Sequence, residues 1–376
     1  MRIGFDAKKI VSNLTGIGNY SRNIVNALSA YPDNRYVLFA PQKGTEECLR
    51  DLKESASVSF VYPSAHSSFG QEWWRCRGIT GEIARQQIDI FHGLSNELPM
   101  GLHKTKCKSI VTIHDLIFLR HPEYYNFIMR QILKAKTYYA CRHADKIIAI
   151  SRQTKQDIMD FYHIPESRIE VVYQGCNPVF QHKVSEDVQL ATQKFYQIPS
   201  RYILCVGTIE PRKNQLTLVR TLPELREKIH LVLIGKSTPY QHVIEEEAHR
   251  LGIQERVHIF NRIPNRDLPA IYQGSTLFAS LSFFEGFGIP VLEAITSGVP
   301  VIAATGSCLE EAGGPDSIYC DPSNPAQIAD KFNELLACPE RRVQMIQSGL
   351  KYASSFSESS VTGQLLSVYR QLLQRE

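Results

Sequence analysis

The strongest constraint on the fold is an alternation of short apolar runs with longer amphipathic stretches, which restarts in the second half of the chain. β-Branched runs separated by helical stretches favour parallel sheets joined by crossover helices. The runs of the first half are RIGFDA, YVLFAP, SVSFVYP, DIFHGL, SIVTIHDL, KIIAIS and IEVVYQG, and those of the second are RYILCVGTI, IHLVLIG, RVHIFNRI, STLFASLS, PVIAA and SIYCD. The pattern predicts an α/β protein with two doubly wound, Rossmann-like domains that face a central cleft.

A polar stretch from residue 177 to residue 200 separates the two patterns. It contains Pro178 and Pro199 and no run that resembles a buried strand, as is typical of a connection between domains. Near the C-terminus, apolar residues recur at helical spacing; they are Val361, Leu365, Leu366, Tyr369 and Leu372. We therefore expect a first domain over 1–178, a second over 179–355, and a helix over 356–376 that packs back on the first domain.

Composition excludes several classes of protein. With 376 residues, of which 43% are hydrophobic and 21% charged, the chain has the length of two globular domains. It shows no signal-peptide pattern and no apolar window of membrane-spanning length, so we expect a cytoplasmic protein. The nine cysteines form no Cys-x-x-Cys pair, which argues against a zinc site or a disulfide framework.

Charge is unevenly distributed between the two halves. The net charge of +4 is too small for a dedicated nucleic-acid binder. Counting Lys and Arg against Asp and Glu gives 23 − 17 = +6 for residues 1–178 and 19 − 21 = −2 for the remainder. The segments QEWWRCR and RQILKAKTYYACRHADK could therefore contact an anionic membrane or a lipid-linked acceptor. The alternative is that they are packed aromatic residues and a solvated helix face.

Two acids flank a glycine-containing loop in the segment SFFEGFGIPVLEAITSGVPVIAA. We expect a helix to begin at Ile289, with Pro290 and Glu293 in its first turn and Glu285 at the loop entrance. The backbone of residues 286–289 would then offer amide groups and the positive end of a helix dipole to an anion such as phosphate. A carboxylate beside it would suit sugar hydroxyls. Alternatively, Glu285 caps the loop and Glu293 only complements the dipole.

A second loop of the same half supplies cations. After the strand YILCVGT comes IEPRKNQLTLVRTL, which places Arg212 and Lys213 at the expected start of a helix. Two cations there would stabilise the charge that builds on a departing diphosphate. The alternative, a solvated basic pair, is disfavoured because cations oppose the dipole at a helix N-terminus.

In the first half, Gly16 and Gly18 precede a helical stretch, and His114 and Asp115 end an apolar strand. A Gly-x-Gly pair indicates only that a ligand or another segment approaches the backbone closely. His114 and Asp115 lie at the sheet edge where substrates bind, so we expect them to act in catalysis. A histidine at a strand end also commonly has a structural role.

Taken together, these motifs resemble the retaining glycosyltransferases of family 4, which have the two-domain GT-B fold. The resemblance runs nearly end to end; its segments include TGIGNY, TIHDL, IIAIS, RIEVVYQGCNPVF, VGTIEPRKNQ, LVLIGK, NRIPNRDLPAIYQGSTLFASLS, FFEGFGIPVLEAITSGVPVIAA and GSCLEEAGGPDSIYCDP. The chain departs from the family at Thr208, where many members have an arginine. TIHDL and GTIEPRKN are also similar to the corresponding segments of bacterial mannosyltransferases that build surface polysaccharides.

The resemblance assigns roles to individual residues. Glu285 would hold hydroxyls of the donor sugar, Glu293 would bind the nucleotide ribose, and Arg212 and Lys213 would neutralise the diphosphate. Further positions follow in the same way: the amides of Gly286, Phe287, Gly288 and Ile289 beside the donor, the backbone of Arg262 and Ile263 at the nucleobase, His114 at the donor sugar, and Gly16 and Gly18 facing the phosphates and the acceptor.

The expected activity is transfer of a hexose from a nucleotide diphosphate sugar, GDP-mannose or a UDP-sugar, to a glycan or lipid-linked glycan acceptor. The resemblance implies no obligatory metal and no other cofactor. It also implies retention of the anomeric configuration. Because no carboxylate is placed as a nucleophile, we expect the acceptor to attack the face from which the diphosphate leaves and a phosphate oxygen to take its proton. Two alternatives remain open, a sugar-nucleotide epimerase of the same fold and a non-catalytic homologue that binds sugar nucleotides.

Overall fold

The computed structural model describes residues 1–64 and 67–374, which form two compact units. The first unit comprises Met1–Gln174 together with Glu358–Glu376, and the second comprises Gly175–Ser357. The division thus falls four residues before the boundary expected at residue 178. The segment expected to connect the domains contains helix α9 (Glu186–Tyr196) and no strand.

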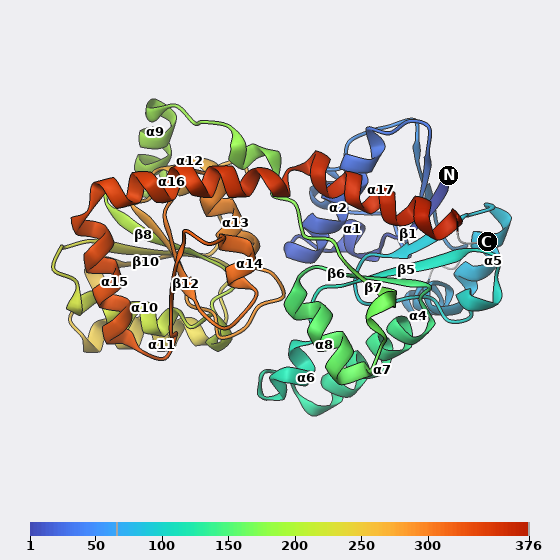
Figure 1. Cartoon of the computed structure of the whole chain (residues 1–376), viewed down its shortest axis with the longest axis horizontal. Helices are drawn as coiled ribbons and strands as arrows, with labels where there is room; N and C mark the ends of the chain where they lie inside the picture. The colour runs from blue at the N-terminus through green and yellow to red at the C-terminus, as the bar shows by residue number, and fades with distance from the viewer. Residues whose placement is uncertain (65–66, 375–376) are drawn as a thin grey trace. The chain divides into compact units, whose positions relative to one another are not determined.

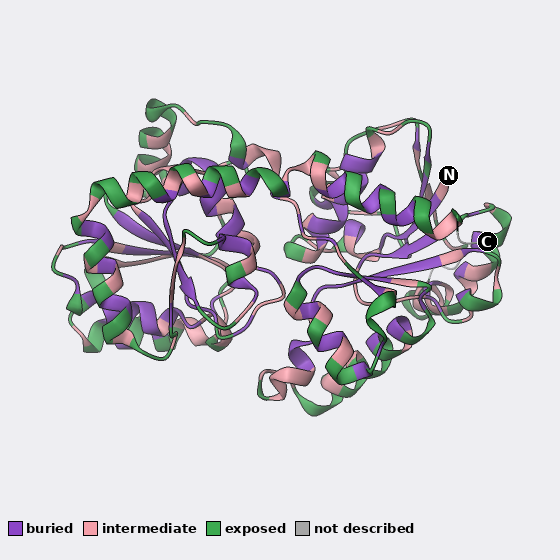
Figure 2. Cartoon of the chain, in the orientation of Figure 1, coloured by how far each residue is buried: buried purple, intermediate pink, exposed green. Residues whose placement is uncertain are grey.

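The first unit is built on a seven-stranded parallel sheet (Figure 1). Its strands are β1 (Arg2–Asp6), β2 (Arg35–Phe39), β3 (Val58–Val61), β4 (Ile90–Gly93), β5 (Lys108–Ile113), β6 (Lys146–Ala149) and β7 (Ile169–Val171). They lie in the order β3-β2-β1-β4-β5-β6-β7. Strands of such a sheet are covered on both faces, and Figure 2 shows the inner strands almost continuously buried, whereas the edge strands β3 and β7 are partly exposed. All seven predicted strands of this half are confirmed.

Helices of the first unit join successive strands, and the last helix of the chain is added to them. They are α1 (Lys8–Ser12), α2 (Gly16–Ser29), α3 (Glu46–Leu49), α4 (Ser68–Trp73), α5 (Ile79–Arg85), α6 (Ile117–Arg120), α7 (Phe127–His143), α8 (Arg152–Tyr162) and α17 (Glu358–Gln374). In α17, Val361, Leu365, Leu366 and Tyr369 are buried in the same apolar cluster as residues of β1 and β2. The prediction of a C-terminal helix that packs on the first domain is confirmed.

The second unit contains a six-stranded parallel sheet in the order β10-β9-β8-β11-β12-β13. The strands are β8 (Tyr202–Val206), β9 (His230–Ile234), β10 (Val257–Phe260), β11 (Leu277–Ser280), β12 (Val301–Ala304) and β13 (Ile318–Cys320). Besides α9, the helices are α10 (Gln215–Thr221), α11 (Tyr240–Arg250), α12 (Leu268–Gln273), α13 (Ile289–Thr296), α14 (Leu309–Gly313), α15 (Pro325–Ala337) and α16 (Pro339–Ala353). The six strands predicted in this half are also confirmed.

The strand orders identify one place in each sheet where ligands are expected. The chain starts near the middle of each sheet and builds outward first in one direction and then in the other. The order therefore reverses between β1 and β4 in the first unit and between β8 and β11 in the second. In open parallel sheets, ligands bind beyond the carboxyl ends of the strands at such a reversal. The loop after β8 contains Arg212 and Lys213, and the loop after β11 contains Glu285 and leads into α13, where Glu293 lies.

Candidate functional site

Arg212 and Lys213 lie in the loop that follows β8, within a single 3₁₀ turn, η6 (Pro211–Lys213). Asn214 then adopts a left-handed conformation with φ of 55°, and α10 begins only at Gln215. The prediction that the two cations start a helix is therefore wrong in detail, because the tight turn and Asn214 separate them from it. Their side chains do not oppose the dipole of α10 from within its first turn.

The loop after β11 places Glu285 between these two cations. One carboxylate oxygen, Oε2, lies 2.9 Å from Nη1 of Arg212, and the other, Oε1, lies 2.5 Å from Nζ of Lys213. Arg212 also donates to the carbonyl oxygen of Phe284 at 2.6 Å and to Oε1 of Glu210 at 2.6 Å. The three charged side chains of Arg212, Lys213 and Glu285 are only 12–16% exposed, so solvent screens their attraction weakly.

The ion pairs determine the charge of Glu285. Burial alone would raise the pKa of this carboxyl, but Lys213 and Arg212 outweigh burial and lower the pKa to about 2. Ser282, which is buried on the same loop, adds a hydrogen bond that lowers the pKa further. Glu285 is thus a carboxylate at neutral pH. Together with Arg212, Lys213 and Glu210, it forms a polar cluster of two cations and two acids.

Helix α13 begins at Ile289 with Pro290 in its first turn, as predicted. Gly288 precedes it with φ of 111°, a conformation that favours glycine. A Cβ atom at Gly288 would also lie 2.6 Å from a methyl carbon of Leu309. The backbone amides of Gly288 and Ile289 donate no hydrogen bond within the described part of the chain. Together with Gly286 and Phe287 in the same loop, they form a segment where an anion could approach the backbone.

Glu293 lies in the second turn of α13, so the expectation that it occupies the first turn is wrong. Its carboxylate accepts a 2.8 Å hydrogen bond from the hydroxyl of Tyr272, a fully buried residue of α12. Burial raises the pKa of Glu293 to about 7, against the opposing effect of that hydrogen bond. Tyr272 is in turn held between the rings of Phe180 and Phe278. A rigid aromatic group therefore fixes the position of this acid.

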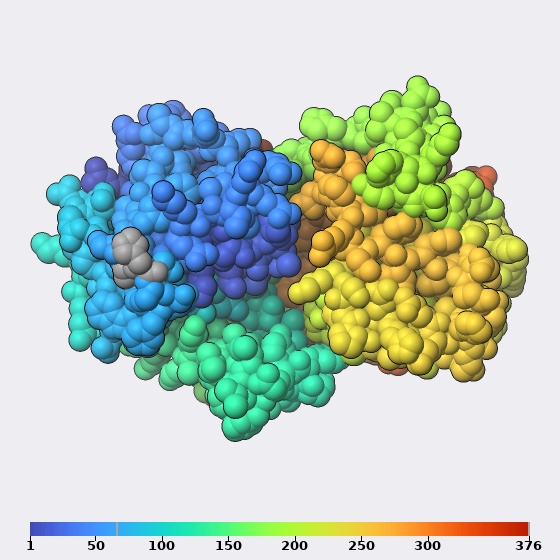
Figure 3. Space-filling view, turned by 180° about the vertical axis from the view of Figure 1, so that it is seen from behind, coloured from blue at the N-terminus to red at the C-terminus, as the bar shows by residue number. Residues whose placement is uncertain are grey.

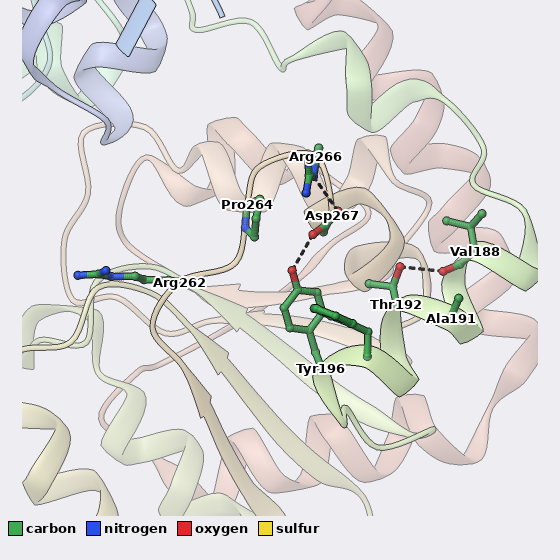
Figure 4. A pocket seen from close by; sticks show the side chains of 9 residues that line it. Val188, Ala191, Thr192, Tyr196, Arg262, Pro264, Arg266 and Asp267 are labelled. Carbon is green, nitrogen blue, oxygen red and sulfur yellow. Dashed lines mark hydrogen bonds and ion pairs between the residues drawn. The ribbon is translucent and has the colours of Figure 1, made fainter. Parts of the chain in front are cut away.

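Arg262 and Ile263, expected at the nucleobase, follow β10 at the edge of the sheet, two strands away from β8. At this edge a shallow pocket lies between α9 and the loop after β10 (Figure 4). Arg262, Pro264, Arg266 and Asp267 line it from the loop, and the hydroxyl of Tyr196 donates to Asp267 at 2.6 Å. Arg262 is exposed and its side chain points away from the other lining residues in Figure 4.

In the first unit, the two glycines at the start of α2 differ in what surrounds them. A Cβ atom at Gly18 would lie 1.9 Å from the backbone oxygen of Asn13, so packing alone requires glycine there. A Cβ atom at Gly16 would meet nothing within 4 Å, and Gly16 is exposed. Packing therefore does not explain Gly16, which remains a candidate for close approach by a ligand.

His114 is buried at the end of β5, and protein groups occupy both of its ring nitrogens. Nε2 lies 2.8 Å from the carbonyl oxygen of Leu94, and Nδ1 lies 3.1 Å from the side-chain nitrogen of Gln174. A neutral ring with its proton on Nε2 satisfies both contacts. Burial lowers the pKa of His114 to about 4, which fits this form. As placed, the ring offers no nitrogen to a substrate, and the adjacent Asp115 accepts from the amide of Ile117 at 3.1 Å.

Two buried polar clusters of the first unit were not predicted. Arg75, in the π-helical turn η1 (Trp74–Gly78), pairs with Asp6 at 2.8 Å and with Glu97 at 2.6 Å. Asp6 ends β1 and Glu97 follows β4, so the cluster lies where the strand order reverses. In the sequence, the positions of these two acids at strand ends are the feature that could have indicated this cluster. The position of Arg75 could not be inferred, because it comes from a separate segment.

The second cluster is a chain of hydrogen bonds that begins on α17. The hydroxyl of Tyr369 lies 2.7 Å from Nδ1 of His92, whose Nε2 lies 2.8 Å from the hydroxyl of Thr112. Thr112 lies 3.3 Å from the hydroxyl of Tyr20, and the ring of Tyr20 meets that of His114 edge-on at 4.8 Å. All five residues are buried. The last helix is therefore connected to the ring of His114 through this chain of contacts.

Within residues 1–64 and 67–374, no group of three His, Cys, Asp or Glu side chains is placed to hold a metal ion. Nor does any helix in them combine the length and the apolar character needed to cross a membrane.

Comparison with known families gives two matches that lie end to end. Residues 14–180 match the family model described as Glycosyltransferase Family 4, and residues 192–352 match that described as Glycosyl transferases group 1. The first family thus covers most of the first unit, and the second covers the loops with Arg212, Lys213 and Glu285 as well as helix α13 with Glu293.

Similar proteins agree with these matches. The O-antigen chain mannosyltransferase B of Escherichia coli is 25% identical over 385 residues, covering 99% of this chain and 100% of that protein. Sucrose-phosphate synthase from Thermosynechococcus elongatus has a similar structure, with a TM-score of 0.81, 17% identity and full coverage of both chains. Anabaena HepE in complex with UDP-glucose gives a TM-score of 0.76 at 17% identity, covering 99% of this chain and 100% of that one. The chain has the GT-B fold and belongs to the glycosyltransferases that the two family models describe.

Proposed function

We propose that this glycosyltransferase moves a hexose from a nucleotide diphosphate sugar, and that Arg212 and Lys213 bind the diphosphate. The observation that carries the proposal is the cluster in which Glu285 lies within 3 Å of both cations, beside the start of α13. Cations and backbone amides that are fixed before the reaction stabilise charge as it develops on a leaving group. The cluster provides both kinds of group on two adjacent loops.

The charges of the cluster suggest how a donor would be accommodated. Arg212 and Lys213 together contribute +2, and Glu285 and Glu210 together contribute −2, so the cluster is neutral without a ligand. A diphosphate that pairs with the cations would replace the carboxylate of Glu285 as their partner. Glu285 would then be available to accept hydrogen bonds from sugar hydroxyls. Glu293, fixed by Tyr272, would bind the ribose in the same way.

We further propose that the sugar is mannose and that the acceptor is a glycan or a lipid-linked glycan. The support is the similarity along the whole chain to an O-antigen mannosyltransferase. The nucleobase would lie beside the backbone of Arg262 and Ile263 after β10. Both GDP and UDP donors deserve testing, because the solved structure of HepE contains UDP-glucose.

Retention of the anomeric configuration and independence from metal ions complete the proposal. Arg212, Lys213 and the amides near Gly288 would supply the positive charge at the leaving group, so a chelator should leave turnover unchanged. The acceptor hydroxyl would attack the face from which the diphosphate departs and give its proton to a phosphate oxygen. Nuclear magnetic resonance of the product would report its anomeric configuration, and an inverted product would refute this mechanism.

The decisive experiment compares Arg212→Ala and Lys213→Ala with Arg220→Ala. Arg220 also pairs with a glutamate of the second unit, Glu247 at 2.6 Å, but its side chain is 50% exposed. Loss of one well-placed donor to a developing charge typically costs about 3 kcal/mol, or roughly a hundredfold in turnover. We expect losses of that size in the first two variants and none in the control.

Nearly unchanged turnover in both site variants would refute the assignment of the diphosphate site. The wild-type protein should also be incubated with GDP-mannose or UDP-glucose alone and with membranes that supply acceptor. A product that is an isomer of the donor, formed without acceptor, would identify an epimerase and refute the transfer reaction.

A further inference from the structure

A network of alternating charges extends from Arg75 toward the surface of the first unit. On one side, Glu72 of α4 lies 3.3 Å from Nε of Arg75 and 2.6 Å from Nζ of Lys8. On the other side, Glu97 lies 2.6 Å from Nη2 of Arg75 and 3.2 Å from Nζ of Lys136. Three cations and two acids therefore alternate along one line of contacts.

The network is buried at its centre and open to solvent at its ends. The side chains of Arg75 and Asp6, which pair at 2.8 Å, are only 5% and 3% exposed. The four outer side chains are between 26% and 45% exposed: Glu97, Lys8, Lys136 and Glu72. Figure 3 shows the segment that contains α4, in light blue, on the surface of the first unit. A molecule in solvent would thus meet two carboxylates and two ammonium groups around a buried guanidinium.

The network adjoins the strand end that carries His114 and Asp115. Glu97 follows β4 at the reversal of strand order, where ligands bind in such sheets. Asn96, its neighbour in the chain, accepts the amide hydrogen of His114 at 2.8 Å. The same side chain donates to the carbonyl oxygen of Asp115 at 3.3 Å. The turn η1, which contains Arg75, is π-helical, and such turns occur frequently at functional sites.

The protonation states of the outer groups determine which ligand atoms they can contact. Burial would raise the pKa of Glu97, but Arg75 and Lys136 outweigh it and lower the pKa. The pKa of Glu72 is likewise lowered, by Lys8 and Arg75 against the effect of burial. Both groups are therefore carboxylates, which only accept hydrogen bonds, whereas the two ammonium groups only donate them. A carboxylate can accept about four hydrogen bonds, so each of these retains capacity beyond its two ion pairs.

The balance of charge favours a neutral ligand with several hydroxyl groups. The three cations of the network and its three acids, Asp6 included, give a net charge of zero. An anion would therefore gain no net attraction from it. A hydroxyl group both donates and accepts hydrogen bonds, so neighbouring hydroxyls of a sugar ring can contact a carboxylate and an ammonium group at the same time.

An exposed aromatic ring lies beside the network on α4. Phe69 is 83% exposed and precedes Glu72 by three residues, which places the two side chains on the same side of the helix. The C–H groups of a sugar form an apolar face that packs on an aromatic ring, whose face is electron-rich. An exposed ring next to a carboxylate is thus complementary to both parts of a sugar.

We propose that the exposed ends of this network bind the terminal sugar of a neutral glycan acceptor. Glu72 and Glu97 accept hydrogen bonds from its hydroxyl groups, and Phe69 packs against its ring. Lys8 and Lys136 donate hydrogen bonds to hydroxyl oxygens. That this sugar is the acceptor rests on the proposed transfer reaction, whereas its binding can be measured without turnover.

Saturation-transfer difference nuclear magnetic resonance of the full chain with mannobiose tests the proposal. We expect the wild-type protein to transfer magnetisation to the sugar. Glu72→Ala and Glu97→Ala each remove hydrogen bonds to a charged group and should weaken binding roughly tenfold. Mannose 6-phosphate should bind no more tightly than mannobiose, because the network has no net charge.

Glu82→Ala is the matched control. Glu82 is 20% exposed and pairs with Arg85 on α5 of the same unit, so its loss also removes an ion pair but leaves the network intact. Thermal unfolding would verify that every variant is folded. Should Glu97→Ala fail to fold, Glu72→Ala decides the test, since this side chain is nearly half exposed.

Four results would overturn the proposal: no binding of mannobiose by the wild-type protein, unchanged binding in Glu72→Ala, an equal loss in Glu82→Ala, or tighter binding of mannose 6-phosphate. A sugar that binds in the second unit would instead be lost in Glu285→Gln, and this outcome would also refute it. The proposed function fails separately. Unchanged turnover in Arg212→Ala and Lys213→Ala would refute the diphosphate site while leaving the binding of mannobiose intact.

Discussion

Replacing Glu285 by glutamine should destabilise the second unit and at the same time strengthen its binding of diphosphates. The change removes the negative charge between Arg212 and Lys213 but keeps nearly the same shape. Loss of one partner from a largely buried ion pair costs about 3 kcal/mol. The depression of the pKa of Glu285 from 4.5 to about 2 corresponds to a similar energy. For a unit of this size, that loss lowers the melting temperature by about 6–12 °C.

The same variant leaves two cations close together without a counterion. Inorganic pyrophosphate, GDP or UDP should therefore raise the melting temperature more in Glu285→Gln than in the wild-type protein, because the anion restores the missing negative charge. Scanning calorimetry with and without each anion measures both effects. Turnover should fall in the variant, since glutamine cannot accept the hydroxyl hydrogen bonds as strongly as a carboxylate.

A glutamate elsewhere in the second unit provides the control. Glu247 also bridges two arginines, Arg220 and Arg250, but these are 50% and 65% exposed. Glu247→Gln should cost less than about 1 kcal/mol and should not alter the response to pyrophosphate. If Glu285→Gln behaves like this control in both stability and diphosphate binding, the proposed competition between Glu285 and the donor is refuted.

The pH dependence of stability follows from the direction of the pKa shift. Because the pKa of Glu285 in the folded protein lies below 4.5, the carboxylate contributes its full stabilisation above about pH 4.5. That contribution declines as the pH falls toward 2. The difference in unfolding free energy between wild type and Glu285→Gln should therefore be constant from pH 5 to pH 8 and shrink under more acidic conditions.

Three other predictions concern separate parts of the structure. The pKa of Glu293 is raised to about 7, so this group makes the folded state less stable as the pH rises from 4.5 to 7. In urea titrations, Glu293→Gln should therefore gain stability relative to wild type between pH 5 and pH 8. A difference in unfolding free energy between the two proteins that stays constant over this range would contradict that pKa. Gly16→Ala should leave thermal stability unchanged but reduce turnover, whereas Gly18→Ala should lower stability because of its contact with Asn13; equal stability of the two variants would contradict the packing argument. Tyr369→Phe should cost about 1–3 kcal/mol in unfolding free energy, because it leaves the buried Nδ1 of His92 without a partner. A loss below about 0.5 kcal/mol would show that His92 finds another partner.

The architecture could be predicted from sequence because its signals are local. Each strand is a short apolar run, and the start of α13 follows from Gly288 and Pro290. The amphipathic spacing of α17 likewise indicated both a helix and a buried face. These features depend on residues that are neighbours in the chain, so periodicity and turn chemistry are sufficient to find them.

The contacts within the candidate site could not be predicted in the same way. Glu285 and Arg212 are 73 residues apart, and only the order of strands brings their loops together. The support of Glu293 by Tyr272 depends on how α12 packs beside α13. His114 was expected to face a substrate, but its ring contacts depend on Leu94 and Gln174, two residues that no local pattern connects with it. Pairings of this kind require the tertiary structure.

The position of α17 also affects the order in which the protein can assemble during translation. Its buried residues complete the apolar core of the first unit, yet the ribosome synthesises them after the entire second unit. Part of the apolar core of the first unit therefore stays exposed while about 180 further residues are synthesised. A chaperone that shields this surface during synthesis should therefore raise the yield of folded protein.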